Sequence, residues 1–121
     1  MDDRERSTAL REAASRQIQR ARAETLRLIS SLARQWDELV ASTDLSNADD
    51  EHDPEGATIA FERARLSGSL ARARTDLEAL DRAVIRLEAG DYWFCERCGQ
   101  PIAPARLDAR PAARTCITCA T

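Results

Sequence analysis

The sequence has no lysine, few aromatic residues and no long apolar run. All 18 of its basic residues are arginine, and aromatic residues make up 4% of the chain against 32% charged residues. So few large apolar side chains exclude a large globular core. Apolar runs reach only three or four residues, and the charged start M-D-D-R-E-R-S lacks the apolar stretch of a secretory signal. We therefore expect a small cytoplasmic protein with no membrane segment.

The charge is distributed unevenly along the chain. The net charge of −3 argues against a general nucleic-acid binder, which is usually strongly basic. Residues 44–55 contain six acidic residues and no arginine, whereas residues 92–121 contain four arginines and two acidic residues. We expect an acidic segment in the middle of the chain and a mildly basic C-terminal part.

Four cysteines, the only ones present, lie in a C-x2-C-x17-C-x2-C array near the C-terminus: Cys95, Cys98, Cys116 and Cys119. Two such pairs are typical of a structural zinc site, since two residues between cysteines let both thiolates of a turn face one metal. Two disulfides or a redox-active pair are the alternatives. We predict one structural zinc ion per chain. A site closed by four thiolates has no open position for a substrate, so we do not expect an enzyme.

Heptad spacing of apolar residues predicts two long helices that pair. The second segment repeats strongly, with Arg63 as its one polar interruption, at Ile59, Leu66, Ala73, Leu80 and Leu87 and at Leu70, Leu77 and Val84. The first segment repeats at Ile18, Thr25, Leu32 and Leu39 and at Ala21, Leu28 and Gln35, widened by Ile29, Trp36 and Val40. Two apolar stripes joined by a polar connection favour a hairpin. If its register centres on the turn, Leu32 meets Leu70 and Ile18 meets Val84. The predicted fold is mainly α: a long antiparallel helical hairpin, or coiled coil, with a small C-terminal four-cysteine zinc finger.

The boundaries of these parts follow from capping residues. We predict a helical hairpin over residues 1–90, with paired arms at about 16–43 and 57–89, and a zinc finger over 91–121. An acidic tip at about 44–56 joins the arms. Asp53 is a suitable N-cap, Pro54 suits the first helical position, and Gly90 suits the residue that follows a helix.

The cysteine region resembles the C4 zinc finger of the DksA/TraR family of bacterial transcription factors. The resembling elements are Cys95-Glu96, Cys98-Gly99, Ile102, Arg106-Leu107, Ala109-Arg110-Pro111 and Cys116-Ile117-x-Cys119. The resemblance covers roughly the last 30 residues tightly. It implies that the coiled coil enters the secondary channel of RNA polymerase, where acidic residues at its tip act near the catalytic magnesium ion and modulate initiation.

The residues that this resemblance assigns to partner binding at the tip are Asp49, Asp50, Glu51, Asp53 and Glu55. Family members carry D-x-x-D-x-A at this place. Aligning the motif on Asp53 puts Gly56 at the second aspartate and Thr58 at the alanine, whereas aligning it on Asp50 and Asp53 puts Glu55 at the alanine. His52 lies among these acids, and we expect no specific role for it.

The zinc finger contributes two further candidates, Arg106 and Arg110, as effector or polymerase contacts. Their alternative role is structural: bonds to the zinc loop or to Asp108. Among the cations that the family uses for the alarmone (p)ppGpp, Arg110 is matched, but Ala79 and Ala120 replace the other two. The sequence therefore gives little support for cooperation with (p)ppGpp.

Taken together, these features predict an RNA polymerase-binding transcription regulator that is not an enzyme and does not bind DNA sequence-specifically. The alternative is a zinc-stabilised protein–protein interaction module without activity on polymerase. Two further classes fit less well. A DNA-binding zinc ribbon would carry more arginines, and a transcript-cleavage factor of the Gre type shares the hairpin but not the four-cysteine finger.

Overall fold

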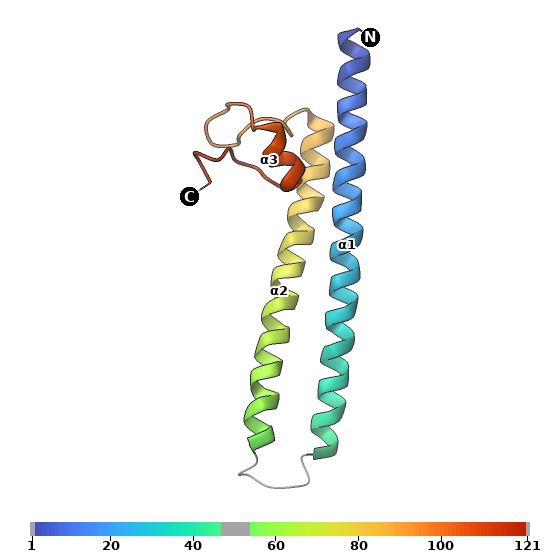
Figure 1. Ribbon diagram of the computed structural model, residues 1–121, viewed down its shortest axis with the longest axis vertical. Coiled ribbons are helices and arrows are strands. Elements are labelled where there is room, and N and C mark those ends of the chain that lie inside the picture. The colour runs from blue at the N-terminus through green and yellow to red at the C-terminus, as the bar shows by residue number, and fades with distance from the viewer. Residues whose placement is uncertain (1, 47–53, 121) are drawn as a thin grey trace. The chain divides into compact units, whose positions relative to one another are not determined.

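The computed structural model describes residues 2–46 and 54–120 and is mainly α-helical, as predicted. Its helices are α1 (Asp3–Ser46), α2 (Pro54–Ala89) and the short α3 (Pro104–Ala109), labelled in Figure 1. None of the helices in these two ranges is long and apolar enough to cross a membrane. Two long helices followed by a cysteine-bearing segment match the predicted fold class.

α1 extends further than its predicted arm, whereas α2 begins at Pro54, the predicted first helical position, and ends at Ala89. α1 begins at Asp3, well before residue 16, because the Asp2 carboxylate accepts a hydrogen bond from the Glu5 backbone N–H at 2.8 Å and caps the helix. At the other end, helix continues to Ser46 and resumes at Pro54, so the predicted tip at 44–56 contains helical residues on both sides. The proposed N-cap, Asp53, lies outside the described residues.

The chain divides by its contacts into two compact units. One contains the described residues up to Glu24 together with those from Asp76 onward, and the other contains Thr25–Thr75. The predicted division into a hairpin over 1–90 and a finger over 91–121 uses different boundaries and stays a prediction.

The unit Thr25–Thr75 is held by an antiparallel helical seam. Its buried residues are Leu32, Leu66, Leu70 and Ala73, with Ile29, Trp36 and Leu39 packed against them. Leu32 and Leu70, which the predicted register pairs, belong to this one cluster. The Arg63 guanidinium lies over the Trp36 ring, 5.5 Å from its centroid, so the polar interruption of the heptad covers an aromatic face.

The predicted α1 stripe of Ala21, Leu28 and Gln35 is wrong at two of its three positions, while Ala21 packs against the core of the other unit. Leu28 is 50% exposed and Gln35 is also exposed, whereas their neighbours Ile29 and Trp36 pack into the seam. The α1 residues of this seam follow one another in steps of three and four residues: Ile29, Leu32, Trp36 and Leu39. A shift of one residue turns a side chain about 100° around a helix, which moves Leu28 out of the seam.

In the other unit, the part of α1 before Thr25, the end of α2 and the cysteine region share one core. Ile18, Leu80, Ala83 and Leu87 from the helices cluster with Tyr92, Cys95, Ile102 and Leu107. Ile18 and Tyr92, at 0% and 1% exposure, are the largest fully buried side chains among the described residues. Val84, which the predicted register pairs with Ile18, packs against the same core.

Gly90 ends α2 and turns the chain into the cysteine region. It adopts φ 86°, a left-handed conformation that suits glycine. The Gly90 N–H donates to the Leu87 carbonyl at 3.3 Å and the Asp91 N–H donates to the Arg86 carbonyl at 2.9 Å. This pair of bonds is the Schellman motif, so the predicted helix end is confirmed with its capping geometry.

Candidate metal centre

The first cysteine pair lies in a tight turn closed by backbone hydrogen bonds. The Cys95 N–H donates to the Gln100 carbonyl at 2.8 Å, and the Gly99 N–H donates back to the Cys95 carbonyl at 2.9 Å. Gly99 has φ 73°, which a residue with a side chain rarely adopts. An isolated β-bridge between Phe94 and Pro101 closes the base of the turn. Cys95 and Cys98 therefore face the same side of one rigid loop.

The second pair follows α3 and an irregular segment. Pro104 occupies the start of α3, and Leu107 of this helix is buried in the core. The Cys119 N–H donates to the Cys116 carbonyl at 3.1 Å, which forms the second turn. A backbone bond of 2.9 Å from the Glu96 N–H to the Arg114 carbonyl joins the two turns directly.

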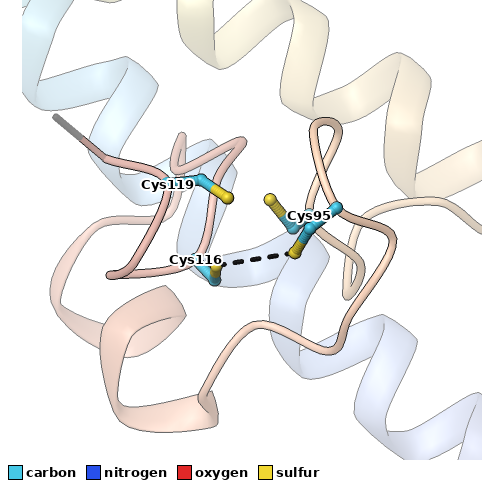
Figure 2. A group of neighbouring side chains, drawn as sticks. Cys95, Cys116 and Cys119 are labelled. Atoms are coloured by element: carbon cyan, nitrogen blue, oxygen red, sulfur yellow. Dashed lines mark hydrogen bonds between the residues drawn. The ribbon is translucent and has the colours of Figure 1, made fainter.

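The four sulfur atoms converge, as predicted, with all of them within 4.8 Å of one another. Figure 2 shows the side chains of Cys95, Cys116 and Cys119 directed toward a common point. The Sγ atoms of Cys98 and Cys116 are 3.7 Å apart. A tetrahedral zinc ion with Zn–S bonds of about 2.3 Å requires S···S distances of about 3.8 Å, whereas a disulfide bond is about 2.05 Å long. All four cysteines are free thiols, so the cluster can hold one zinc ion.

The pKa values of the thiols are shifted in opposite directions. Hydrogen bonds from backbone N–H groups, first that of Cys116 and then that of Cys98, lower the pKa of Cys95 to about 6. The backbone N–H of Cys119 likewise lowers the pKa of Cys116. The hydrogen bond with Cys116, followed by burial, raises the pKa of Cys119 to about 12. Several thiolates this close repel one another, and a divalent cation relieves that repulsion.

The prediction did not assign three side chains that lie near the cysteine turns: Arg86, Tyr92 and Glu96. The Arg86 guanidinium is almost buried and donates to the carbonyls of Phe94, before the first cysteine pair, and Ala113, before the second. The Tyr92 hydroxyl donates to the Pro111 carbonyl at 2.8 Å. Burial is the main reason that the pKa of Tyr92 is raised. The only signal for Arg86 in the sequence is a cation in the last turn of a helix, which is common and unspecific.

The two predicted arginines have different surroundings. Arg106 is partly buried and its Nε donates to the Thr115 carbonyl at 2.9 Å, a structural bond to the zinc loop. Arg110 is exposed, and within residues 2–46 and 54–120 its side chain takes part in no hydrogen bond or ion pair. Both line a groove of about 780 Å³ between α3 and the second cysteine turn, where Ile117 is 79% exposed.

The predicted tip residues are not tested by the structure. Asp49, Asp50, Glu51 and Asp53 lie outside the described residues, as does His52. Glu55 belongs to the first turn of α2. The assignment of these five acidic residues to partner binding therefore stays a prediction.

Comparison with known proteins gives a consistent family. The family model described as the prokaryotic dksA/traR C4-type zinc finger matches residues 90–121. RNA polymerase-binding transcription factor DksA of Caulobacter vibrioides is 48% identical over 42 residues, and its Escherichia coli K12 counterpart is 38% identical over 50 residues. These matches span 35% and 41% of this chain but only 30% and 33% of the relatives' own lengths.

A solved structure extends the similarity beyond the cysteine region. The structure of transcription factor DksA2 from Pseudomonas aeruginosa matches with a TM-score of 0.52 at 30% identity, over 84% of this chain and 78% of that chain. The similarity therefore includes helical segments outside the zinc finger. The chain belongs to the DksA/TraR family, in which its four clustered cysteines form the C4-type zinc finger.

Proposed function

We propose that this protein is a transcription regulator that binds RNA polymerase, with Cys95, Cys98, Cys116 and Cys119 as the ligands of one structural zinc ion. The observation that carries the proposal is the match to DksA2 over 84% of the chain, supported by the cysteine cluster. The curated relatives are named for RNA polymerase binding. The closed thiolate site suits a structural role and not catalysis.

The tip is the proposed active element. In this proposal, the helical arms carry the acidic segment into the secondary channel of polymerase, where carboxylates alter the surroundings of the catalytic magnesium ion. α1 ends at Ser46 and α2 begins at Pro54, so the acidic residues lie between or next to the two helix ends. The seam of Leu32, Leu66 and Leu70 packs α1 against α2 in the unit to which both of these helix ends belong.

The zinc finger supplies a second proposed contact. Arg110 is exposed at the edge of the groove beside α3, and the residues that line this groove include two arginines and no acidic residue. This chemistry suits an acidic surface of polymerase. Arg106 donates to the Thr115 carbonyl, so we assign it a supporting role and Arg110 the contact.

Polymerase binding distinguishes this function from its alternative, a zinc-stabilised interaction module. We expect the purified protein to bind core RNA polymerase at micromolar concentration and a Gre-type factor to displace it. Absence of binding would favour the interaction module. Binding that a Gre-type factor does not displace would place the contact outside the secondary channel.

Neutralising the tip should remove activity but not binding. In Asp50→Asn/Asp53→Asn, we expect the effect on initiation in a purified transcription assay to fall at least tenfold, with polymerase affinity and zinc content unchanged. Substitutions at exposed positions usually change stability by only about 0.5 kcal/mol, so folding should persist. Asp50→Asn alone avoids the helix start at Asp53 and is the cleaner variant. Asp37→Asn/Glu38→Asn, at exposed sites on α1, is the matched control. Full activity of the double tip variant would exclude the proposed role of the carboxylates.

A further inference from the structure

Arg86, near the end of α2, is a nearly buried cation that donates hydrogen bonds to backbone carbonyls. It is 9% exposed, and its guanidinium donates to the carbonyls of Ala113 at 3.1 Å, Asp91 at 3.2 Å and Phe94 at 2.9 Å. Its Nε lies 3.5 Å from the Glu96 carboxylate. Burying a charge is costly unless hydrogen bonds and an opposite charge compensate it, and here both do.

The acceptors of Arg86 lie close in sequence to both cysteine pairs. Phe94 immediately precedes Cys95, and Glu96 immediately follows it. Ala113 belongs to the segment that leads into Cys116. A single planar guanidinium thus fixes the backbone next to the first cysteine turn and the approach to the second. Arginine suits this role because its donors form a rigid fork.

The segment before Cys116 is held at alternate residues by three side chains. Its carbonyls at Pro111, Ala113 and Thr115 accept hydrogen bonds from Tyr92, Arg86 and Arg106 respectively. This segment has no helix or strand ladder of its own, so these bonds set its path together with two backbone bonds, from the Ala113 N–H to the Arg110 carbonyl and from the Glu96 N–H to the Arg114 carbonyl. Arg86 is the central member, and of the three it alone also bonds to the first turn.

We propose that Arg86 is a positioning residue for zinc: it aligns the two cysteine turns before the metal binds and thereby sets the affinity for zinc. Partners outside the ligand set typically change metal affinity by about 10- to 100-fold. The same bonds couple the metal centre to the last turn of α2. Because coupling is reciprocal, zinc binding must strengthen the Arg86 network as much as that network strengthens zinc binding.

Competition for zinc with a chromophoric chelator tests this inference on the full-length protein and needs no polymerase. We expect Arg86→Met, which keeps length but loses the donors, to bind zinc about 10- to 100-fold more weakly. Arg86→Lys keeps the charge but not the fork, and its affinity should lie between. The matched control is Arg82→Met, one turn earlier at an exposed site of α2, which should bind zinc as the wild type does.

A second readout separates positioning from a general loss of stability. Co²⁺ in the same site reports coordination geometry through its visible absorption bands. We expect Arg86→Met to change these bands, whereas Leu70→Ala, which weakens the seam of the other unit, should leave them and the zinc affinity unchanged. Wild-type affinity and bands in Arg86→Met would overturn the inference. If that variant loses its helical circular dichroism, wild-type zinc affinity in Arg86→Lys would overturn it instead.

Discussion

Replacing Cys98 by serine should abolish stoichiometric zinc binding and loosen the core around the metal centre. Structural zinc contributes on the order of 10–16 kcal/mol of apparent binding free energy in small zinc-finger peptides, and three thiolates leave the fourth tetrahedral position to a weaker ligand such as water. Cys98 is exposed, so the change removes a ligand with little loss of packing. Elemental analysis should give about one zinc per wild-type chain and far less per variant chain.

The loosened region can be followed through its aromatic pair. Tyr92 and Trp93 lie edge to face with ring centroids 5.4 Å apart, in the core that the cysteine turns complete. We expect Cys98→Ser to lose near-ultraviolet circular dichroism while most helical signal persists, and a strong chelator to produce the same change in the wild type. Thr118→Ala, also exposed and between two ligands, is the matched control. Stoichiometric zinc in Cys98→Ser, or two disulfides in the wild type, would refute the four-thiolate site.

A charge in the helical seam should be the most destabilising single change in the unit Thr25–Thr75. Leu66 is 2% exposed and packs with Leu32 and Leu70. Truncating a buried leucine typically lowers the free energy of unfolding by about 2–5 kcal/mol. Leu66→Asp should cost more than this, because it also buries an unpaired carboxylate. We follow its thermal unfolding by helical circular dichroism and expect the midpoint to fall by more than about 10 °C. This follows because 1 kcal/mol of stability corresponds to about 4–8 °C in a small domain.

Phe61 provides the matched control for this prediction. It lies on the same helix and is 70% exposed. Phe61→Asp introduces the same charge without placing it in the seam, so its unfolding midpoint should stay close to that of the wild type. Equal loss of stability in the two variants would show that the charge weakens α2 itself and that the proposed seam is not the cause.

The features that the sequence predicts well are those determined by local spacing. The cysteine pairs predict convergent sulfur atoms because a tight turn places residues three apart on one side. The repeat from Leu66 to Leu87 predicts the buried face of α2, because one helix keeps one period over its length. Gly90 predicts the helix end because the left-handed conformation after a helix favours glycine.

The features that the sequence predicts poorly depend on contacts between distant residues. Leu28 and Ile29 are both large and apolar, and only the packing against α2 determines which of them faces the seam. Arg86 resembles the many exposed arginines of this chain. Its burial depends on carbonyls of residues 91–113, whose path no local pattern specifies.

The core that contains Ile18 is built from both ends of the chain, and this has a consequence for synthesis. Ile18 packs with Tyr92, Ile102 and Leu107, so its partners emerge from the ribosome only after most of the chain has been made. The seam at Leu32 and Leu66 joins residues closer in sequence and can form earlier, since loop closure slows contacts between distant residues. Metal loading should therefore be a late event, and until it occurs the newly made chain presents an unfinished apolar surface to chaperones and proteases.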